Sequence, residues 1–370
     1  MSTRVEVALG PRSYPVLVQT HCLPQLGATL RTHGLAQTNA FVLTNPDVAA
    51  LYFSTLETSL KNAGFQRIVR HEIPASEEGK NWDVFSATCA ALLEHFPDAG
   101  ASPLVLLLGG GVVGDLGGFA AAVYRRGVPF VQIPTTLLAA VDSSVGGKVA
   151  VNFGGVKNIM GAFSQPRLVF CDLATLKTLS PRELRSGTAE VIKYGAVCSQ
   201  ALFDDLEAGA LEKLLAQDPE TLVDIVARCV QLKANVVAQD EFDKLGIRNV
   251  LNFGHTIGHA LEAITKYRRF RHGEAIGYGM LAAGRISQWR SLMSEAELNT
   301  LRHAIRSLGP MPAVTDLSIK DALAAITLDK KVISGKLHFV AAKGLGATVS
   351  ISDVTTDELK HALRDIGLRG

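Results

Sequence analysis

A buried strand that runs directly into a glycine-rich turn restricts the fold of this chain more than any other feature. Leu104–Leu108 is an uninterrupted apolar run, and Gly-Gly-Gly-Val-Val-Gly-Asp follows at residues 109–115. A short apolar run that ends at a turn signal is typical of a fully buried strand in a parallel sheet. Residues 116–124 can supply the following helix. The sequence therefore predicts a strand–turn–helix unit at this point.

Short apolar runs and helical periodicity alternate through the whole first half of the chain. The predicted strands are 41–45, 67–69, 129–134 and 168–170, and the predicted helices are 51–63 and 82–96. This alternation indicates an α/β domain with a parallel sheet covered on both faces.

After about Ser180 the pattern becomes helical and stays so to about residue 310. Ser180 is the predicted cap of the first helix, because a proline follows it in the first turn. A β-like piece at 336–341 and a helix from about Asp357 end the chain. We predict an α/β nucleotide-binding domain over 1–180 and a mainly α-helical metal and substrate domain over 181–370.

Charge and cysteine content exclude several classes of protein. Lys plus Arg number 37 and Asp plus Glu 35, and this net charge of +2 argues against a nucleic-acid binder. The first seven residues lack the apolar run of a signal peptide, and no apolar stretch is long enough to span a membrane. The five cysteines form no Cys-x-x-Cys pair, so we expect a cytoplasmic protein without disulfides.

Glycine is concentrated around the turn, with 12 of the 34 glycines between Gly109 and Gly161. The turn satisfies Gly-x-Gly-x-x-Gly after a strand, a pattern in which backbone amides at a helix N-terminus hold a pyrophosphate. The alternative is a tight turn without a ligand. Because several strands and helices precede it, the predicted domain is a variant of the Rossmann arrangement.

A second segment, from Asp142 to Asn158, combines charged and hydroxyl side chains with glycines. It contains Lys148 and Lys157 within apolar surroundings. Ammonium groups next to flexible backbone suit a phosphate or a polyhydroxylated acid. The alternative is that both lysines are solvated loop residues.

Histidines and a carboxylate in the second half indicate a metal site. His255 and His259 are four residues apart on one helical face, His272 follows later, and Glu190 lies upstream with Lys193 on the same face of its helix. Three histidines and a carboxylate are typical of a catalytic zinc site, although each histidine alone could be a core residue. A zincin is excluded because Thr256 stands where its general base belongs. The spacing does not decide whether His255 and His259 both bind the metal.

Taken together, these segments resemble the 3-dehydroquinate synthase family. The strings that carry the resemblance are Gly-Gly-Gly-Val-Val-Gly-Asp (109–115), Pro-Thr-Thr-Leu-Leu (134–138), Asp-Ser-Ser-Val-Gly-Gly-Lys (142–148), Lys-Asn (157–158), Ala-Glu-Val-Ile-Lys (189–193), Asn-Phe-Gly-His-Thr-Ile-Gly-His (252–259) and His-Gly-Glu-Ala (272–275). The resemblance implies a homodimer that uses NAD and Zn²⁺ or Co²⁺ in the shikimate pathway. It would convert 3-deoxy-D-arabino-heptulosonate 7-phosphate to 3-dehydroquinate and phosphate. The implied steps are transient oxidation by NAD, β-elimination of phosphate, re-reduction and aldol closure.

The resemblance also assigns roles to individual residues. The implied metal ligands are Glu190, His255 and His272, whereas His259 would contact substrate. The other implied substrate or catalytic residues are Arg126, Asp142, Lys148, Asn158, Lys193, Lys233, Arg248, Asn252, and Lys330 or Lys331. The implied cofactor-binding residues are Asn45, Glu77, Lys80, Gly110, Gly111, Val112, Val113, Gly114, Asp115, Thr135, Thr136, Asp142, Lys148, Lys157, Thr175, Leu176, Lys177 and Thr178.

The chain departs from the family at residues 75–80, where only Glu77 and Lys80 match the adenosine segment, and at residues 149 and 153–156. Other readings stay open: another sugar phosphate cyclase, a metal-dependent polyol dehydrogenase of the glycerol type, or a non-catalytic nucleotide-binding regulator. The lysines at 148, 157 and 193 weigh against the polyol dehydrogenase, which needs no phosphate-binding cluster.

Overall fold

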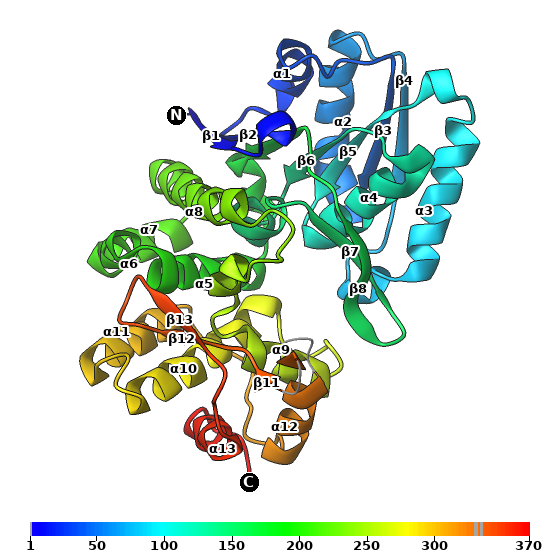
Figure 1. Cartoon of the computed structure of the whole chain (residues 1–370). Coiled ribbons are helices and arrows are strands. Elements are labelled where there is room, and N and C mark those ends of the chain that lie inside the picture. Colours follow the sequence, from blue (N-terminus) through cyan, green and yellow to red (C-terminus); the bar gives the residue numbers. More distant parts are fainter. Residues whose placement is uncertain (1, 329–331, 334–335) are drawn as a thin grey trace. The chain divides into compact units, whose positions relative to one another are not determined.

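The computed structural model of the chain describes residues 2–328, 332–333 and 336–370 (Figure 1). Its contacts divide the chain into two compact units. The first unit comprises 1–179 and 222–242, and the second comprises 180–221 and 243–370. Each unit is therefore built from two separate segments of the chain.

One sheet forms the centre of the first unit. Its described strands follow the order β1-β2-β9-β6-β5-β3-β4. Their bounds are Ser2–Val7 (β1), Tyr14–Gln19 (β2), Leu168–Asp172 (β9), Phe130–Pro134 (β6), Leu104–Gly109 (β5), Asn39–Thr44 (β3) and Arg67–Glu72 (β4). β1 and β2 are antiparallel, and the other neighbouring pairs are parallel. The predicted α/β class is confirmed.

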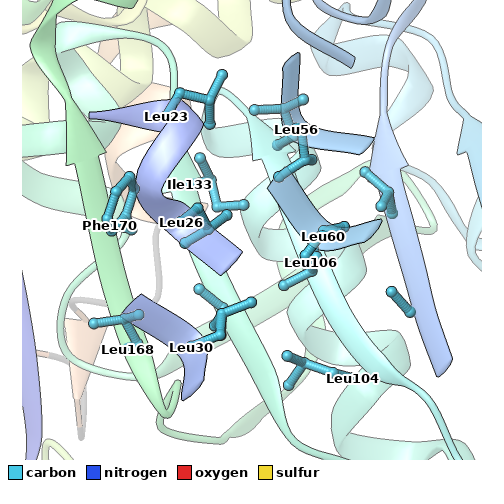
Figure 2. Close-up of a cluster of buried hydrophobic side chains, with 14 of the residues drawn as sticks. Leu23, Leu26, Leu30, Leu56, Leu60, Leu104, Leu106, Ile133, Leu168 and Phe170 are labelled. Atoms are coloured by element: carbon cyan, nitrogen blue, oxygen red, sulfur yellow. The ribbon is translucent and has the colours of Figure 1, made fainter. Parts of the chain in front are cut away.

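Helices cover both faces of this sheet. Successive residues of each strand point to opposite sides, so one strand contributes side chains to the core on each face. Leu104, Leu106 and Leu108 of β5 pack in one cluster with residues of α1 (Leu26–Thr32) and α2 (Pro46–Asn62). Figure 2 shows Leu104 and Leu106 in this cluster with Leu30 and Leu60. Val105 and Leu107 belong to the opposite cluster, with α3 (Trp82–His95) and α4 (Gly111–Val123). The apolar run of β5 is thus buried on both faces, as predicted.

Two hairpins described in the first unit were not expected from the sequence. The first is β1–β2, which adds an antiparallel edge to the sheet. The second is β7 (Lys148–Phe153) with β8 (Val156–Phe163), within the glycine-rich segment. Glycine weakens strand propensity, so this segment carries the signal of a loop rather than that of a hairpin.

The second unit is mostly helical, as predicted. Its described helices include α5 (Pro181–Cys198), α6 (Gln200–Asp205), α7 (Leu211–Leu215), α9 (His255–Ile264), α10 (His272–Trp289), α11 (Glu295–Arg306), α12 (Ile319–Leu328) and α13 (Thr356–Asp365). The side chain of Ser180 accepts a hydrogen bond from the amide of Glu183, which confirms it as the cap of α5. The β-like piece forms β11 (Lys336–Leu337), which pairs with β10 (Val332–Ile333), and β12 (Phe339–Ala342), which pairs with β13 (Thr348–Ile351).

Helix α8 (Pro219–Gln239) lies almost entirely in the first unit, although the predicted second domain, 181–370, includes it. Lys233 of α8 donates to the carboxylate of Asp142 at 2.8 Å and to its carbonyl oxygen at 2.7 Å. Helical periodicity shows that a segment is a helix, but it does not show which core receives the apolar face.

All five cysteines are free thiols, as expected. Burial raises the pKa of Cys22 to about 12 and the pKa values of Cys89 and Cys198 to about 11. These thiols therefore stay protonated and are poor nucleophiles at neutral pH. Among the described residues, no helix combines the length and the apolar character needed to cross a membrane.

Candidate metal and nucleotide sites

A carboxylate and two histidines from three helices meet inside the second unit. Glu190 of α5 is fully buried, and its Oε1 lies 3.7 Å from Nε2 of His255 and 3.5 Å from Nε2 of His272. His255 is the first residue of α9, and His272 is the first residue of α10. One potential ligand atom from each residue lies within 4.8 Å of the other two. One carboxylate oxygen with two imidazole nitrogens is the donor set of a catalytic zinc site.

Glycines let these three helices approach closely enough to bring the donors together. A Cβ on Gly273, next to His272, would lie 1.9 Å from the carbonyl oxygen of Ser186 on α5. Gly254, next to His255, has a φ of +79°, and a Cβ there would lie 2.7 Å from the amide of Met280 on α10. Each histidine therefore has a neighbouring glycine that permits backbone contact. A glycine directly beside each histidine is the sequence signal that could have indicated this close packing.

Hydrogen bonds orient both imidazole rings. Nδ1 of His255 lies 3.2 Å from the carbonyl oxygen of Phe253, and Nδ1 of His272 lies 3.3 Å from Oε1 of the buried Glu262. A carbonyl or carboxylate partner holds the proton on Nδ1 and leaves Nε2 as a lone-pair donor. Both rings thus present the nitrogen that faces Glu190. Sequence reasoning missed Glu262, which lies three residues after His259.

A second group of potential ligands overlaps the first. It consists of His259, Glu262 and His272, again with one ligand atom of each within 4.8 Å of the others. The ring centroid of His259 lies 5.3 Å from that of His255 and 6.0 Å from that of His272. His272 faces Glu262 with Nδ1 and Glu190 with Nε2, so the two groups use different nitrogens of one ring.

Other predicted residues of the second unit lie around the first group. Lys193 is buried and forms an ion pair with Glu190 one helical turn away. Arg248 and Asn252 belong to the 3₁₀ helix η9 (Ile247–Asn252), which packs against α5 and directly precedes α9. Arg248 is buried and Asn252 is half-buried. Lys330 and Lys331 lie outside the described residues.

The glycine turn lies between β5 and α4 in the first unit. Gly110 is the N-cap of α4, and Gly110, Gly111 and Val112 are partly exposed, whereas Val113 and Gly114 are buried. A Cβ on Gly110 would lie 3.0 Å from Thr136, and one on Gly111 would lie 3.2 Å from Ser143. The amides of a first helical turn have no acceptor within the helix. The turn therefore forms a narrow, positively polarised cradle that suits a pyrophosphate.

Lys80 and Asp115 form a buried ion pair beside this turn. Burial raises the pKa of Asp115, whereas the charges of Lys80 and, more weakly, Lys157 oppose this rise. The carboxylate of Glu77 accepts a hydrogen bond from the side chain of Asn152 at 2.9 Å. The structure thus brings together predicted nucleotide residues from positions 77–80, 115 and 157.

The remaining predicted nucleotide residues lie near the carboxyl ends of the parallel strands. Thr135 and Thr136 directly follow β6, and Thr136 accepts a hydrogen bond from the amide of Ala139. Thr175, Leu176, Lys177 and Thr178 lie in η7 (Leu173–Thr178), directly after β9. The hydroxyl of Tyr52 contacts Thr175 and Thr178. Asn45 follows β3 and caps α2 through Val48.

The predicted phosphate-binding residues of the first unit are more scattered. Lys148 begins β7 and is exposed, and Lys157 and Asn158 lie early in β8. Arg126 follows the C-terminal end of α4, a helix of 13 residues, and is exposed with a φ of +64°. A helix of that length is about 20 Å long, so its two ends are well separated. Within one chain, α4 therefore keeps Arg126 away from the glycine turn.

Comparisons with known proteins cover most of the chain. The 3-dehydroquinate synthase N-terminal family matches residues 70–186, and the 3-dehydroquinate synthase C-terminal family matches residues 187–332. A 3-dehydroquinate synthase from Desulforamulus reducens is 43% identical over 97% of this chain and 99% of its own length. One from Geobacter sp. is 44% identical over 94% of each chain.

A solved structure has the same fold. It is a 2-epi-5-epi-valiolone synthase from Streptomyces hygroscopicus subsp. jinggangensis with NAD⁺ and Zn²⁺ bound. It matches with a TM-score of 0.84 and 29% identity over 95% of this chain and 96% of its own. The family matches, the identity along the full chain and the shared fold agree, and the chain belongs to the 3-dehydroquinate synthase family.

Proposed function

We propose that this protein is a 3-dehydroquinate synthase that depends on NAD and a divalent metal ion. It converts 3-deoxy-D-arabino-heptulosonate 7-phosphate to 3-dehydroquinate and phosphate. Its relatives of this name match along nearly the whole chain and are more similar to it than the valiolone synthase is. These similarities do not favour the function of another sugar phosphate cyclase or of a polyol dehydrogenase for this chain.

The observation that carries the proposal is the buried Glu190 with both histidine Nε2 atoms facing one of its oxygens. A buried carboxylate is costly unless cations or hydrogen bonds compensate it. Lys193 pairs with Oε2 of Glu190, and a divalent ion held by the three donors would compensate Oε1, the oxygen that both Nε2 atoms face. Glu190, His255 and His272 are the proposed ligands. When bound, the metal supplies Lewis-acid stabilisation of negative charge on substrate oxygens.

We assign the pyrophosphate of NAD to the turn formed by Gly110, Gly111 and Gly114, and its adenosine side to Glu77 and Lys80. NAD supplies the transient oxidation that makes the proton next to the new ketone acidic. The partly exposed amides at the start of α4 are what supports this assignment. The ion pair with Asp115 holds the Lys80 side chain beside the turn.

The remaining residues are assigned to the substrate by their charge and position. Lys193 and Arg248 are buried cations around the metal group and would balance the substrate's carboxylate and phosphate. Lys233 and Asp142 hold each other in place through their ion pair. His259 is half-buried beside His272, where its imidazole can accept a proton from a substrate hydroxyl and hold it.

Arg126 is not assigned to the substrate on these grounds, because α4 separates it from the glycine turn within one chain. We propose, from the family resemblance, that the protein is a cytoplasmic homodimer. Sedimentation at equilibrium would test the dimer: twice the mass of 39.4 kDa is expected, and the mass of one chain would refute it.

The test of the function is an assay of the pure protein with the heptulosonate phosphate, trace NAD and Zn²⁺. We expect equal amounts of phosphate and 3-dehydroquinate, without net accumulation of NADH. Steady accumulation of NADH would identify a dehydrogenase instead. Phosphate release with an inosose or valiolone-type product from another sugar phosphate would identify a different cyclase.

A further inference from the structure

The strongest feature that the proposed function leaves unexplained is a break in the β7–β8 hairpin. The ladder pairs Val151 with Met160 and then Phe153 with Val156. Between these pairs, Asn152 alone stands on β7 opposite the three residues 157–159 on β8. A bulge of this kind breaks the ladder and turns side chains in new directions, and bulges are frequent next to active sites. Two of the three bulge residues are Lys157 and Asn158, for which the family resemblance implies contacts with the nucleotide and the substrate.

The side chain of Asn152 makes a hydrogen bond in place of the main-chain bond that is missing from the ladder at the bulge. Its side-chain Oδ1 accepts from the amide of Asn158 at 2.9 Å. Asn158 has a φ of +52°, in the left-handed region that asparagine adopts more readily than most residues. The side chain of Asn152 therefore stabilises the particular backbone conformation in which Lys157 and Asn158 are presented.

The nitrogen of the same side-chain amide contacts the segment 77–80, which we assign to the adenosine side of NAD. Nδ2 of Asn152 donates to Oε1 of Glu77 at 2.9 Å. The backbone makes a parallel contact here as well, because the amide of Asn152 donates to the carbonyl oxygen of Lys80 at 2.9 Å. One side chain thus bridges the segment 77–80 and the bulge 157–158, which are far apart in the sequence.

We propose that Asn152 is a positioning residue that couples the nucleotide segment to the substrate bulge. When the ribose side of NAD fixes Glu77, Asn152 holds Asn158 and Lys157 in the geometry needed for the sugar acid phosphate. The inference rests on the proposed function, since it uses the role assigned there to Glu77 and the substrate role that the family resemblance implies for Asn158. Asn152 itself need not touch either ligand.

The variants separate the two ends of the bridge. Asn152→Ala removes the bond with Asn158 and the short bond to Oε1 of Glu77, together with a long contact of 3.5 Å to the carbonyl oxygen of Glu77. Asn152→Asp keeps the acceptor for Asn158 but sets a second carboxylate against Glu77. Glu77→Ala removes the carboxylate acceptor, which breaks the bridge at its 2.9 Å bond and leaves only the 3.5 Å contact to the carbonyl oxygen of Glu77. Asn39→Ala is the structural control, because Asn39 lies at the start of β3 and its side chain bonds, within the described residues, only to the carbonyl oxygen of Ala101. The main-chain bond from Asn152 to Lys80 survives in every variant, so the hairpin stays attached.

The measurements are the Kd for NAD, kcat and KM for the heptulosonate phosphate, and Tm. We expect Asn152→Ala to weaken NAD binding and to raise KM, each by about threefold to tenfold, because one solvent-accessible bond to each partner is lost. Asn152→Asp should recover KM but not the affinity for NAD. Adding Asn152→Ala to Glu77→Ala should weaken NAD binding no further, since the bridge is already broken.

Three results would overturn the inference: wild-type Kd and KM in Asn152→Ala, multiplicative losses of NAD affinity in the double variant, or a change in Tm alone, as in Asn39→Ala. The NAD measurements need no substrate. A wild-type protein that binds NAD but releases no phosphate would therefore refute the proposed function, while the double variant still tests the bridge. A wild-type protein that binds no NAD would refute both.

Discussion

The metal group and the nucleotide region achieve their geometry in different ways. In the second unit, buried side chains on α5, α9 and α10 converge on one point, and the glycines beside the histidines allow the helices to touch. In the first unit, the groups that we assign to the ligands are backbone amides at a glycine turn and side chains on a bulged hairpin that is largely exposed. We therefore expect a single substitution in the metal group to abolish nearly all activity. A substitution in the nucleotide region should reduce activity or affinity only in part.

The largest effect is expected from Glu190→Gln, which removes the charged donor from the buried group. A loss of about 4 kcal/mol of transition-state stabilisation corresponds to about a thousandfold in turnover, and we expect at least that. Bound metal, measured by elemental analysis after dialysis, should fall in parallel. Glu183→Gln on the same helix is the control, because Glu183 is partly exposed and pairs with Arg271. Full metal content in Glu190→Gln would remove this residue from the ligand set.

In the first unit, Lys148→Ala should lower kcat by about a hundredfold or more while the fold survives. Lys148 is exposed at the start of β7, so its loss leaves no cavity, but the phosphate loses a cationic partner. Tm and steady-state kinetics check both parts of this expectation. Lys61→Ala, which removes an exposed lysine paired with Glu57, should match the wild type. Activity retained in Lys148→Ala would contradict the role assigned to this lysine.

The glycine contacts give the sharpest test of packing around the metal group. Gly273→Ala would place a methyl group 1.9 Å from the carbonyl oxygen of Ser186, so α5 and α10 must move apart. We expect a loss of about 3 kcal/mol in the free energy of unfolding, together with weaker metal binding. Gly277→Ala on the same helix meets two side chains, the flexible Met311 at 3.2 Å and Ile305 at an ordinary contact distance of 3.5 Å, and it should be tolerated. Equal stability of the two variants would show that the close approach is not required.

The smallest effect concerns the ion pair of Arg290 with Glu358, which lies at the opposite end of α10 from His272. Hydrogen bonds from Arg290 lower the pKa of Glu358 to about 2 from an ordinary value of 4.5. A lowered carboxyl pKa stabilises the fold above pH 4.5, and this contribution disappears as the pH falls from 4.5 to about 2. Because Glu358 is partly exposed, we expect Glu358→Gln to cost about 1 kcal/mol at pH 7.

Denaturant unfolding at several pH values would measure this contribution. The stability curve of Glu358→Gln should be flatter than that of the wild type between pH 4.5 and 2. Asp357→Asn is the neighbouring control, because its ion pair with Lys360 is exposed and should contribute little. An unchanged acid limb in Glu358→Gln would show that the pair with Arg290 does not stabilise the fold.

The sequence predicted the parts of this molecule that depend on local spacing. The strand β5 follows from five consecutive apolar residues and its turn from the spacing of the glycines. The helical faces that carry Glu190 and His255 follow from a period of about four residues. It could not predict the contacts that join distant segments. Periodicity carries no information about the partner of a polar side chain, so Asn152, Glu262 and the placement of α8 were accessible only from the structure.

The central claim is that the metal binds Glu190, His255 and His272 rather than the overlapping group of His259, Glu262 and His272. Anomalous diffraction at the zinc edge from crystals of the metal-loaded protein tests it directly. We predict one ion per chain, bound by an oxygen of Glu190 and by Nε2 of His255 and His272, with full occupancy retained in His259→Ala. An ion bound to Nδ1 of His272 and to Glu262, or one lost in His259→Ala, would contradict it.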